Sequence, residues 1–193
     1  GLGNRLLVAA VVMQLAINFA NGTYEVIWSL YMASLGASVA VIGITFTIFG
    51  IPMMLLSPPA GRLVDRLGGL PFAVGGGLVV AACGVAYTVA TEPILPTIIG
   101  VIEGCAFAFV SPALYRLLAD GTPTGRSSSA QGLFGAAGNV GIIVSSLVAG
   151  LLWTYTRLRS DDRPVRRALG AAVALIGFGV MAWRLWELLT GEA

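Results

Sequence analysis

Carboxyl and amide side chains stand inside long apolar stretches of this sequence, where ionised or unpaired polar groups are costly. The first stretch carries a series spaced by four, three and four residues: Gln14, Asn18, Asn21 and Glu25. In an α-helix this spacing places all of them along one face. We expect that face to line a substrate path or a water-filled cavity. The alternative is that it forms hydrogen bonds with a neighbouring helix.

Glu103 stands near the middle of a later apolar stretch, and no basic residue lies within one helical turn of it. A carboxyl group in such a place should keep its proton while dry and release it when water enters. That behaviour suits a site that couples proton movement to another process. The alternative is a protonated side chain that only hydrogen-bonds to a neighbouring helix.

Enzymatic and metal chemistry find little support in the sequence. It contains no His, and its two cysteines, Cys83 and Cys105, have no partner at metal-ligand or redox spacing. His-dependent triads and His-based metal sites are therefore excluded. The glycine run Gly75-Gly76-Gly77 lacks the Lys and the Ser or Thr of a phosphate-binding loop. We expect no enzyme, no metal site and no cofactor.

Composition indicates a membrane protein. Of the 193 residues, 57% are hydrophobic and only 10% are charged, with a mean hydropathy of +0.90, whereas soluble domains carry about 25% charged residues. The net charge of +2 is too small to suggest nucleic acid as a partner. Because one span needs about 20 apolar residues, this length accommodates about six membrane helices.

Breaker-rich turns divide the chain into these spans. We predict them at Leu6–Met32, Val39–Leu56, Leu70–Ala90, Ile94–Leu118, Ser129–Tyr155 and Leu169–Leu189. They must be helices, because backbone groups in lipid have to be satisfied within the segment. No stretch alternates as the strands of a membrane barrel do. The fold class expected is thus an all-α membrane protein, one bundle over residues 1–193 with both termini on the same face.

A short charged segment joins the second and third predicted spans: Gly61-Arg62-Leu63-Val64-Asp65-Arg66-Leu67-Gly68. We expect a tight loop that forces the two spans into an antiparallel hairpin. It resembles the signature loop of the major facilitator superfamily, Gly-x-Leu-x-Asp-Arg-x-Gly, here over residues 61–71. The basic residues that usually follow are replaced by Gly69 and Leu70.

The resemblance implies a transporter whose two six-helix halves each contain two inverted three-helix repeats. One half has about the length of this chain, which also lacks an initial Met and is expected to be a fragment or a processed chain. Gly100 stands where first halves often carry Arg, which favours the second half. The resemblance also places the signature loop and both termini in the cytoplasm, since Arg counts do not decide the orientation. It leaves the Arg-rich segment 157–167 unexplained.

Two further sets of residues are expected to form a gate and a helix-packing surface in such a transporter. A gate on the cytoplasmic face should bring together the signature segment and the next loop on that face: Gly61, Asp65, Arg66, Gly68, Arg116 and Asp120. A stripe of glycines in the fifth span should let helices approach closely: Gly132, Gly135, Gly138 and Gly141. Asn139 beside this stripe is a candidate for the cavity wall.

In this family the first and fourth helices of each half line the central cavity, so the resemblance puts Glu25 and Glu103 on one cavity. We predict half of a secondary active transporter in the cell membrane that exports small amphipathic or cationic compounds. Protons drive this export, and the partners are the other six-helix half, the lipid bilayer and the small-molecule substrate. The alternatives are an importer of a sugar, an acid or a peptide, and a non-transporting helical scaffold or binding half.

Overall fold

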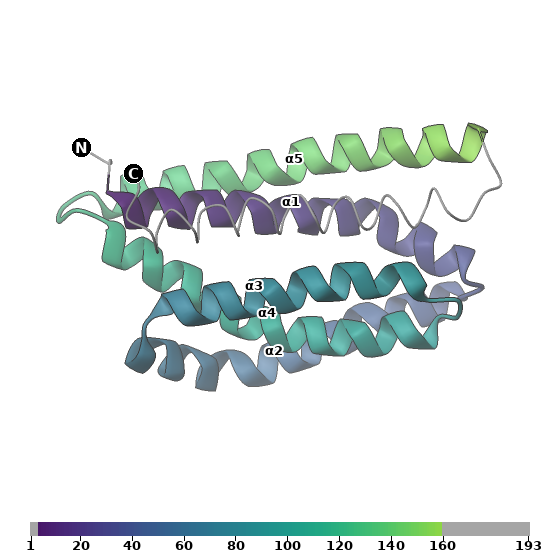
Figure 1. The fold of residues 1–193 in the computed structure, drawn as a ribbon, viewed down its shortest axis with the longest axis horizontal. Coiled ribbons are helices and arrows are strands. Elements are labelled where there is room, and N and C mark those ends of the chain that lie inside the picture. The colour runs from purple at the N-terminus through teal and green to yellow at the C-terminus, as the bar shows by residue number, and fades with distance from the viewer. Residues whose placement is uncertain (1–3, 160–193) are drawn as a thin grey trace.

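The computed structural model describes residues 4–159, which form a bundle of long helices (Figure 1). The elements are α1 (Arg5–Ser34), α2 (Val39–Leu67), α3 (Gly69–Ala86), the 3-10 turn η1 (Tyr87–Val89), α4 (Ile94–Gly121) and α5 (Ser127–Arg159). Five helices, α3 being counted with η1, are long and apolar enough to cross a membrane. The described residues contain no strand, so the all-α prediction is confirmed for them. The sixth predicted span, Leu169–Leu189, lies outside the described residues.

The helices pack as two groups that meet at α4. In one group α1 lies along α5, and in the other α2 and α3 both pack against α4 (Figure 1). Contacts between α1 and α4 join the groups. The start of α1, the α2–α3 junction and the α4–α5 connection lie at the same end of the bundle (Figure 1). The other two connections lie at the opposite end, as expected for antiparallel neighbours.

Apolar side chains from several helices form the core, and Leu7, Val110 and Leu114 are among the most deeply buried. By contrast, α2 buries few of its residues and leaves large apolar side chains such as Phe46, Met54 and Leu55 more than half exposed. Such a face is costly in water, so it requires lipid or another membrane-embedded surface.

The signature segment is helical for most of its length, which differs from the tight loop expected from the sequence. The second span was predicted to end at Leu56, whereas α2 continues to Leu67 despite containing three prolines. Gly68 is the one residue between α2 and α3, and its φ of +89° is a conformation that favours glycine. The charged side chains of this segment therefore project from the end of a helix.

Glycines set the close approach of α1 and α5. A Cβ atom on Gly141 would lie only 2.6 Å from the Leu15 carbonyl oxygen, and one on Gly138 would lie 3.1 Å from Nε2 of Gln14. For Gly132 and Gly135, in contrast, no atom of a neighbouring helix among the described residues lies within 4 Å of where a Cβ would stand. Only the second half of the expected stripe therefore lies at the close contact between α1 and α5, which we call the α1–α5 seam.

The seam makes a prediction that alanine substitutions can check. Gly141→Ala should lower stability by roughly 1–3 kcal/mol, because its methyl group would overlap the α1 backbone. Gly135→Ala is the matched control on the same helix and should be neutral or slightly stabilising, since alanine has the higher helix propensity. Thermal unfolding of both variants in detergent measures the difference. Equal melting temperatures would contradict the close contact.

Candidate functional site: a carboxyl group in an aromatic cavity

A cavity of about 320 Å³ lies between α1, α2, η1 and α4, and α5 contributes only Ile142 to its wall. Most of the wall is apolar or aromatic. The aromatic side chains are Tyr24, Trp28, Phe46, Phe49, Tyr87 and Phe107, and the polar ones are Asn18, Asn21, Glu25, Thr45, Thr97 and Glu103. A mostly apolar cavity with a few convergent polar groups is the usual form of a small-molecule site.

Glu103 is the buried carboxyl group of this wall, with only 4% of the residue exposed. The Tyr87 hydroxyl donates a hydrogen bond of 2.6 Å to its Oε2 atom. Its Oε1 atom has no hydrogen-bond partner among the described residues. The neighbouring Gly104 lets α4 approach α2 closely, since a Cβ there would lie 2.5 Å from the Phe49 carbonyl oxygen.

Three aromatic rings of α1 and η1 pack edge to face beside this carboxyl group. The ring centroids of Trp28 and Tyr87 are 5.3 Å apart, and those of Tyr24 and Tyr87 are 5.8 Å apart. Hydrogen bonds fix the cluster, because Trp28 Nε1 donates to Thr45 Oγ1 at 2.9 Å and the Tyr31 hydroxyl donates to the Tyr87 carbonyl oxygen at 2.6 Å. Buried tyrosine and tryptophan usually need such partners for their polar atoms.

The charged side chains that the structure describes on the cavity wall are all acidic. Two carboxyl groups, Glu25 and Glu103, belong to its wall, and within residues 4–159 no arginine does. Glu25 is exposed and Glu103 is buried. When ionised, these groups favour a cation, and aromatic faces add cation–π attraction. The arrangement can therefore bind a small positively charged molecule that also carries apolar surface.

Of the polar residues expected on the first helix, Asn18, Asn21 and Glu25 lie on the cavity, whereas Gln14 does not. The Gln14 side chain lies at the α1–α5 seam, next to Gly138. Asn139 is exposed on α5 and is likewise absent from the cavity wall.

The sequence analysis missed the aromatic residues of the site. A signal existed in the spacing of Tyr24, Trp28 and Tyr31, which repeats every three or four residues on the same helix as Glu25. Tyr87 had no comparable signal. Its partner Glu103 lies on a different helix, and several polar residues elsewhere in the chain could have served equally well.

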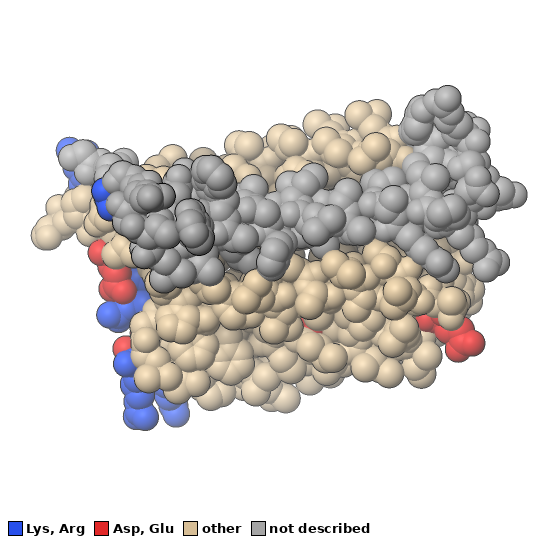
Figure 2. All heavy atoms as spheres, viewed as in Figure 1, with Lys and Arg blue, Asp and Glu red and all other residues tan. Residues whose placement is uncertain are grey.

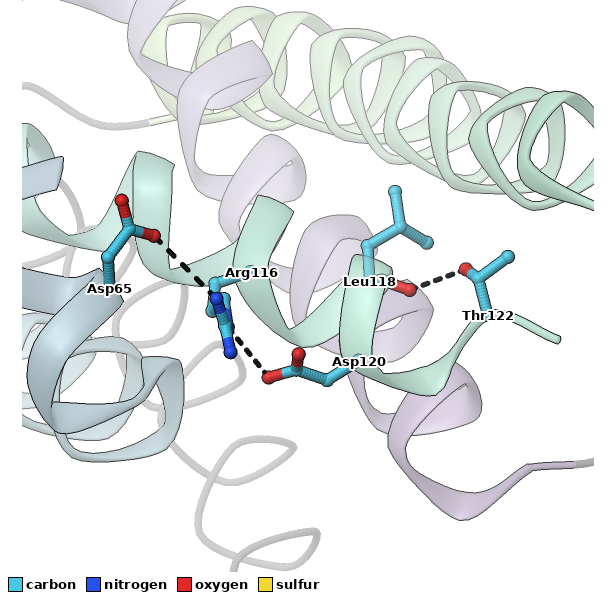
Figure 3. A network of polar contacts seen from close by, with 5 residues as sticks. All are labelled: Asp65, Arg116, Leu118, Asp120 and Thr122. Atoms are coloured by element: carbon cyan, nitrogen blue, oxygen red, sulfur yellow. Dashed lines mark hydrogen bonds and ion pairs between the residues drawn. The ribbon is translucent and has the colours of Figure 1, made fainter. Parts of the chain in front are cut away.

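A second polar cluster lies at the end of the bundle where charged side chains gather (Figure 2). Arg116 Nε donates to Asp120 Oδ2 at 3.0 Å, and Arg116 Nη1 lies 3.9 Å from Asp65 Oδ1 (Figure 3). The structure thus joins α2 to α4 through one arginine. In the described part of the chain Arg66 forms no ion pair. All three interacting side chains are substantially exposed, so the pairs contribute little stability, about 0–1 kcal/mol each.

The Tyr87–Glu103 bond makes a prediction about stability. Tyr87→Phe should lower stability by roughly 1–3 kcal/mol, because it leaves the buried Glu103 carboxyl without its hydrogen-bond donor. Tyr115→Phe is the control, since Tyr115 is 60% exposed. Thermal unfolding in detergent compares the two, and an unchanged melting temperature in Tyr87→Phe would show that the bond contributes nothing.

Comparison with known proteins agrees with this membrane architecture. Residues 6–189 match the family model for the Major Facilitator Superfamily. The chain is 27% identical over 122 residues to Multidrug resistance protein 2 of Bacillus subtilis (strain 168), which covers 63% of this chain and 30% of that protein. It is 30% identical over 122 residues to the inner membrane transport protein YajR of Escherichia coli (strain K12), covering 63% of this chain and 26% of that protein.

The matched stretch therefore spans less than a third of either relative. The family model, in contrast, extends over almost all of the chain. The resemblance first noted in the signature segment is confirmed by this match. The chain belongs to the major facilitator superfamily of membrane transporters.

Proposed function

We propose that this chain is one half of a secondary active transporter that exports small amphipathic or cationic compounds in exchange for protons. The observation that carries the proposal is the buried Glu103 carboxyl, which lies on a cavity lined by aromatic rings. Transport follows from alternating access, in which two halves rock about a site near the middle of the membrane.

Glu103 suits the role of coupling proton movement to transport because its carboxyl group lies inside a membrane span. Ionisable residues inside membrane spans are costly, and they commonly mark ion or proton pathways. A carboxyl group that alternates between a closed, dry state and an open, wet state can exchange a proton for a cation. Each turnover then carries a proton in one direction and the substrate in the other.

The cavity chemistry favours a cation over the other substrate classes considered. An acid would meet the carboxyl groups of Glu25 and Glu103 without an arginine from residues 4–159 to balance it. A sugar would find mostly aromatic and apolar wall and few donors. The name of the Bacillus subtilis relative, Multidrug resistance protein 2, also points to compounds of this kind.

The partner in this proposal is a second six-helix half. The apolar face that α2 leaves exposed provides surface for that half and for the bilayer. We retain the six-helix arrangement, its inverted repeats, the assignment to the second half and the cytoplasmic termini as parts of the same proposal. The cell membrane is its place of action.

The main test compares driven transport with exchange. Glu103→Gln keeps the shape of the side chain but cannot ionise. In proteoliposomes of the complete protein it should abolish accumulation driven by a pH gradient, while exchange of substrate across the membrane continues. Radiolabelled lipophilic cations provide the measurement.

Glu25→Gln is the matched control, because the exposed Glu25 carboxyl lies on the same cavity. We expect this variant to keep most of its gradient-driven transport. Uphill transport at the wild-type rate in Glu103→Gln would rule out Glu103 as the coupling site.

The charged end of the bundle makes a separate prediction. Asp65→Asn should slow transport several-fold, because it weakens the contact between α2 and α4 in one of the two access states. Since the Asp65–Arg116 pair is exposed, stability should change by less than about 1 kcal/mol. Arg126→Gln, at the same end, is the control and should transport normally. A normal rate in Asp65→Asn would show that the pair does not gate.

A further inference from the structure

We propose that Gly100 determines which cations the cavity accepts, because the space beside it takes an aromatic ring of the substrate. This inference rests on the proposed function, since it takes cation binding in the cavity as given. It adds the residue that sets the size and shape of the cation.

Gly100 is a buried residue in the interior of α4, and it belongs to the cavity wall. A Cβ atom at this position would meet only the Tyr87 hydroxyl oxygen, at 3.8 Å, which is ordinary van der Waals contact. A methyl group would therefore fit here without moving a neighbour. The hydrogen bond between Tyr87 and Glu103 does not require a glycine at this place.

The other buried glycines whose surroundings the structure describes have a role in packing. At each of them a Cβ atom would lie 3.1 Å or less from an atom of another helix: Gly22, Gly69, Gly104, Gly121, Gly138 and Gly141. Such glycines let two helices approach closely. Gly100 differs from all of them, because no described helix packs against it closely enough to exclude a side chain.

A glycine inside a helix lowers stability relative to alanine, because its backbone loses more freedom on folding. Close packing among the described residues does not compensate for this loss at Gly100. A ligand in the cavity would, since the missing side chain leaves volume that a bound molecule can fill. Gly100 thus has the property expected of a residue that makes room for a substrate.

The position of Gly100 indicates which part of a cation would fill that volume. Residues at helical spacing on one face of α4 line the cavity, namely Pro96, Gly100, Glu103 and Phe107. Gly100 lies one turn from Glu103, so a cation whose charge is near that carboxyl group can extend its apolar part over Gly100. An aromatic ring suits this place, since Pro96 and Tyr87 provide apolar and aromatic surface beside it.

The test compares two quaternary cations that differ by one ring. Tetramethylammonium has only the charged group, and benzyltrimethylammonium carries the same group with a phenyl ring in place of one hydrogen. Displacement of a bound radiolabelled lipophilic cation from the complete protein gives both dissociation constants. In the wild-type protein we expect the benzyl compound to bind about tenfold more tightly or better, because it buries its ring beside Gly100.

Enlarging residue 100 should remove this preference. Gly100→Leu should weaken binding of benzyltrimethylammonium about tenfold, because the leucine side chain occupies the volume of the ring, and should change binding of tetramethylammonium by about twofold or less. Gly100→Ala should have the same effect on a smaller scale, about two- to fivefold for the benzyl compound. Val101→Leu is the control, because Val101 is not part of the cavity wall, and it should bind both cations like the wild type.

Thermal unfolding separates this role from packing and requires no ligand. Gly100→Ala should raise the melting temperature by about 2–4 °C, because alanine is the better helix former and its methyl group fits. Gly104→Ala, one turn away on α4, is the matched control and should lower it, since a Cβ there would lie 2.5 Å from the Phe49 carbonyl oxygen. A lower melting temperature in Gly100→Ala would assign the glycine to packing and overturn the inference.

Equal binding of the two cations to the wild-type protein would overturn the inference but leave the proposed function intact. The same holds if Gly100→Leu binds the benzyl compound as the wild type does, or weakens both cations equally. If Gly100→Leu does not fold, the ratio of the two dissociation constants in Gly100→Ala decides. Failure of both cations to bind the wild-type protein would remove the proposed cation specificity together with the inference.

Discussion

The hydrogen bond between Tyr87 and Glu103 constrains much of this structure. It gives a partner to a carboxyl group inside an apolar helix, where an unpaired carboxylate is costly. Tyr87 stands in the turn η1 that follows α3, and the Tyr31 hydroxyl of α1 donates a hydrogen bond to the carbonyl oxygen of Tyr87. The two hydrogen bonds at Tyr87 together link α1, the end of α3 and α4.

The helix that carries this carboxyl group is also the centre of the packing. α1, α2 and α3 all contact α4, and the close contact at Gly104 brings the α2 backbone next to the site. A shift of α2 along α4 would therefore change the cavity wall as well as the packing. The cavity and the interface between helices are built from the same contacts, so a movement of these helices would also reshape the cavity.

The span assignments were predictable because long apolar runs are a strong signal. Five of them agree with α1 to α5 within a few residues, except at the end of α2. The difference arises because charged residues occur in turns but also at the end of a helix that reaches water. The length of α2 could not be inferred from hydropathy alone.

Only part of the expected glycine stripe lies at the contact between α1 and α5, for a geometric reason. Gly132 and Gly141 are nine positions apart, and at about 100° per residue this corresponds to two and a half turns. The two glycines therefore point in opposite directions, and only Gly138 and Gly141 can share a face with α1. The carboxyl–tyrosine pair was unpredictable on different grounds, because it joins separate helices and depends on their relative rotation.

The junction between α2 and α3 has a mechanical consequence. Only Gly68 stands between the two helices, so the end of α2 and the start of α3 have to move together, while the glycine still allows the angle between them to change. The far end of α3 leads into η1 and Tyr87, so this single helix connects the glycine joint at the charged end with the hydroxyl group that donates to the Glu103 carboxyl.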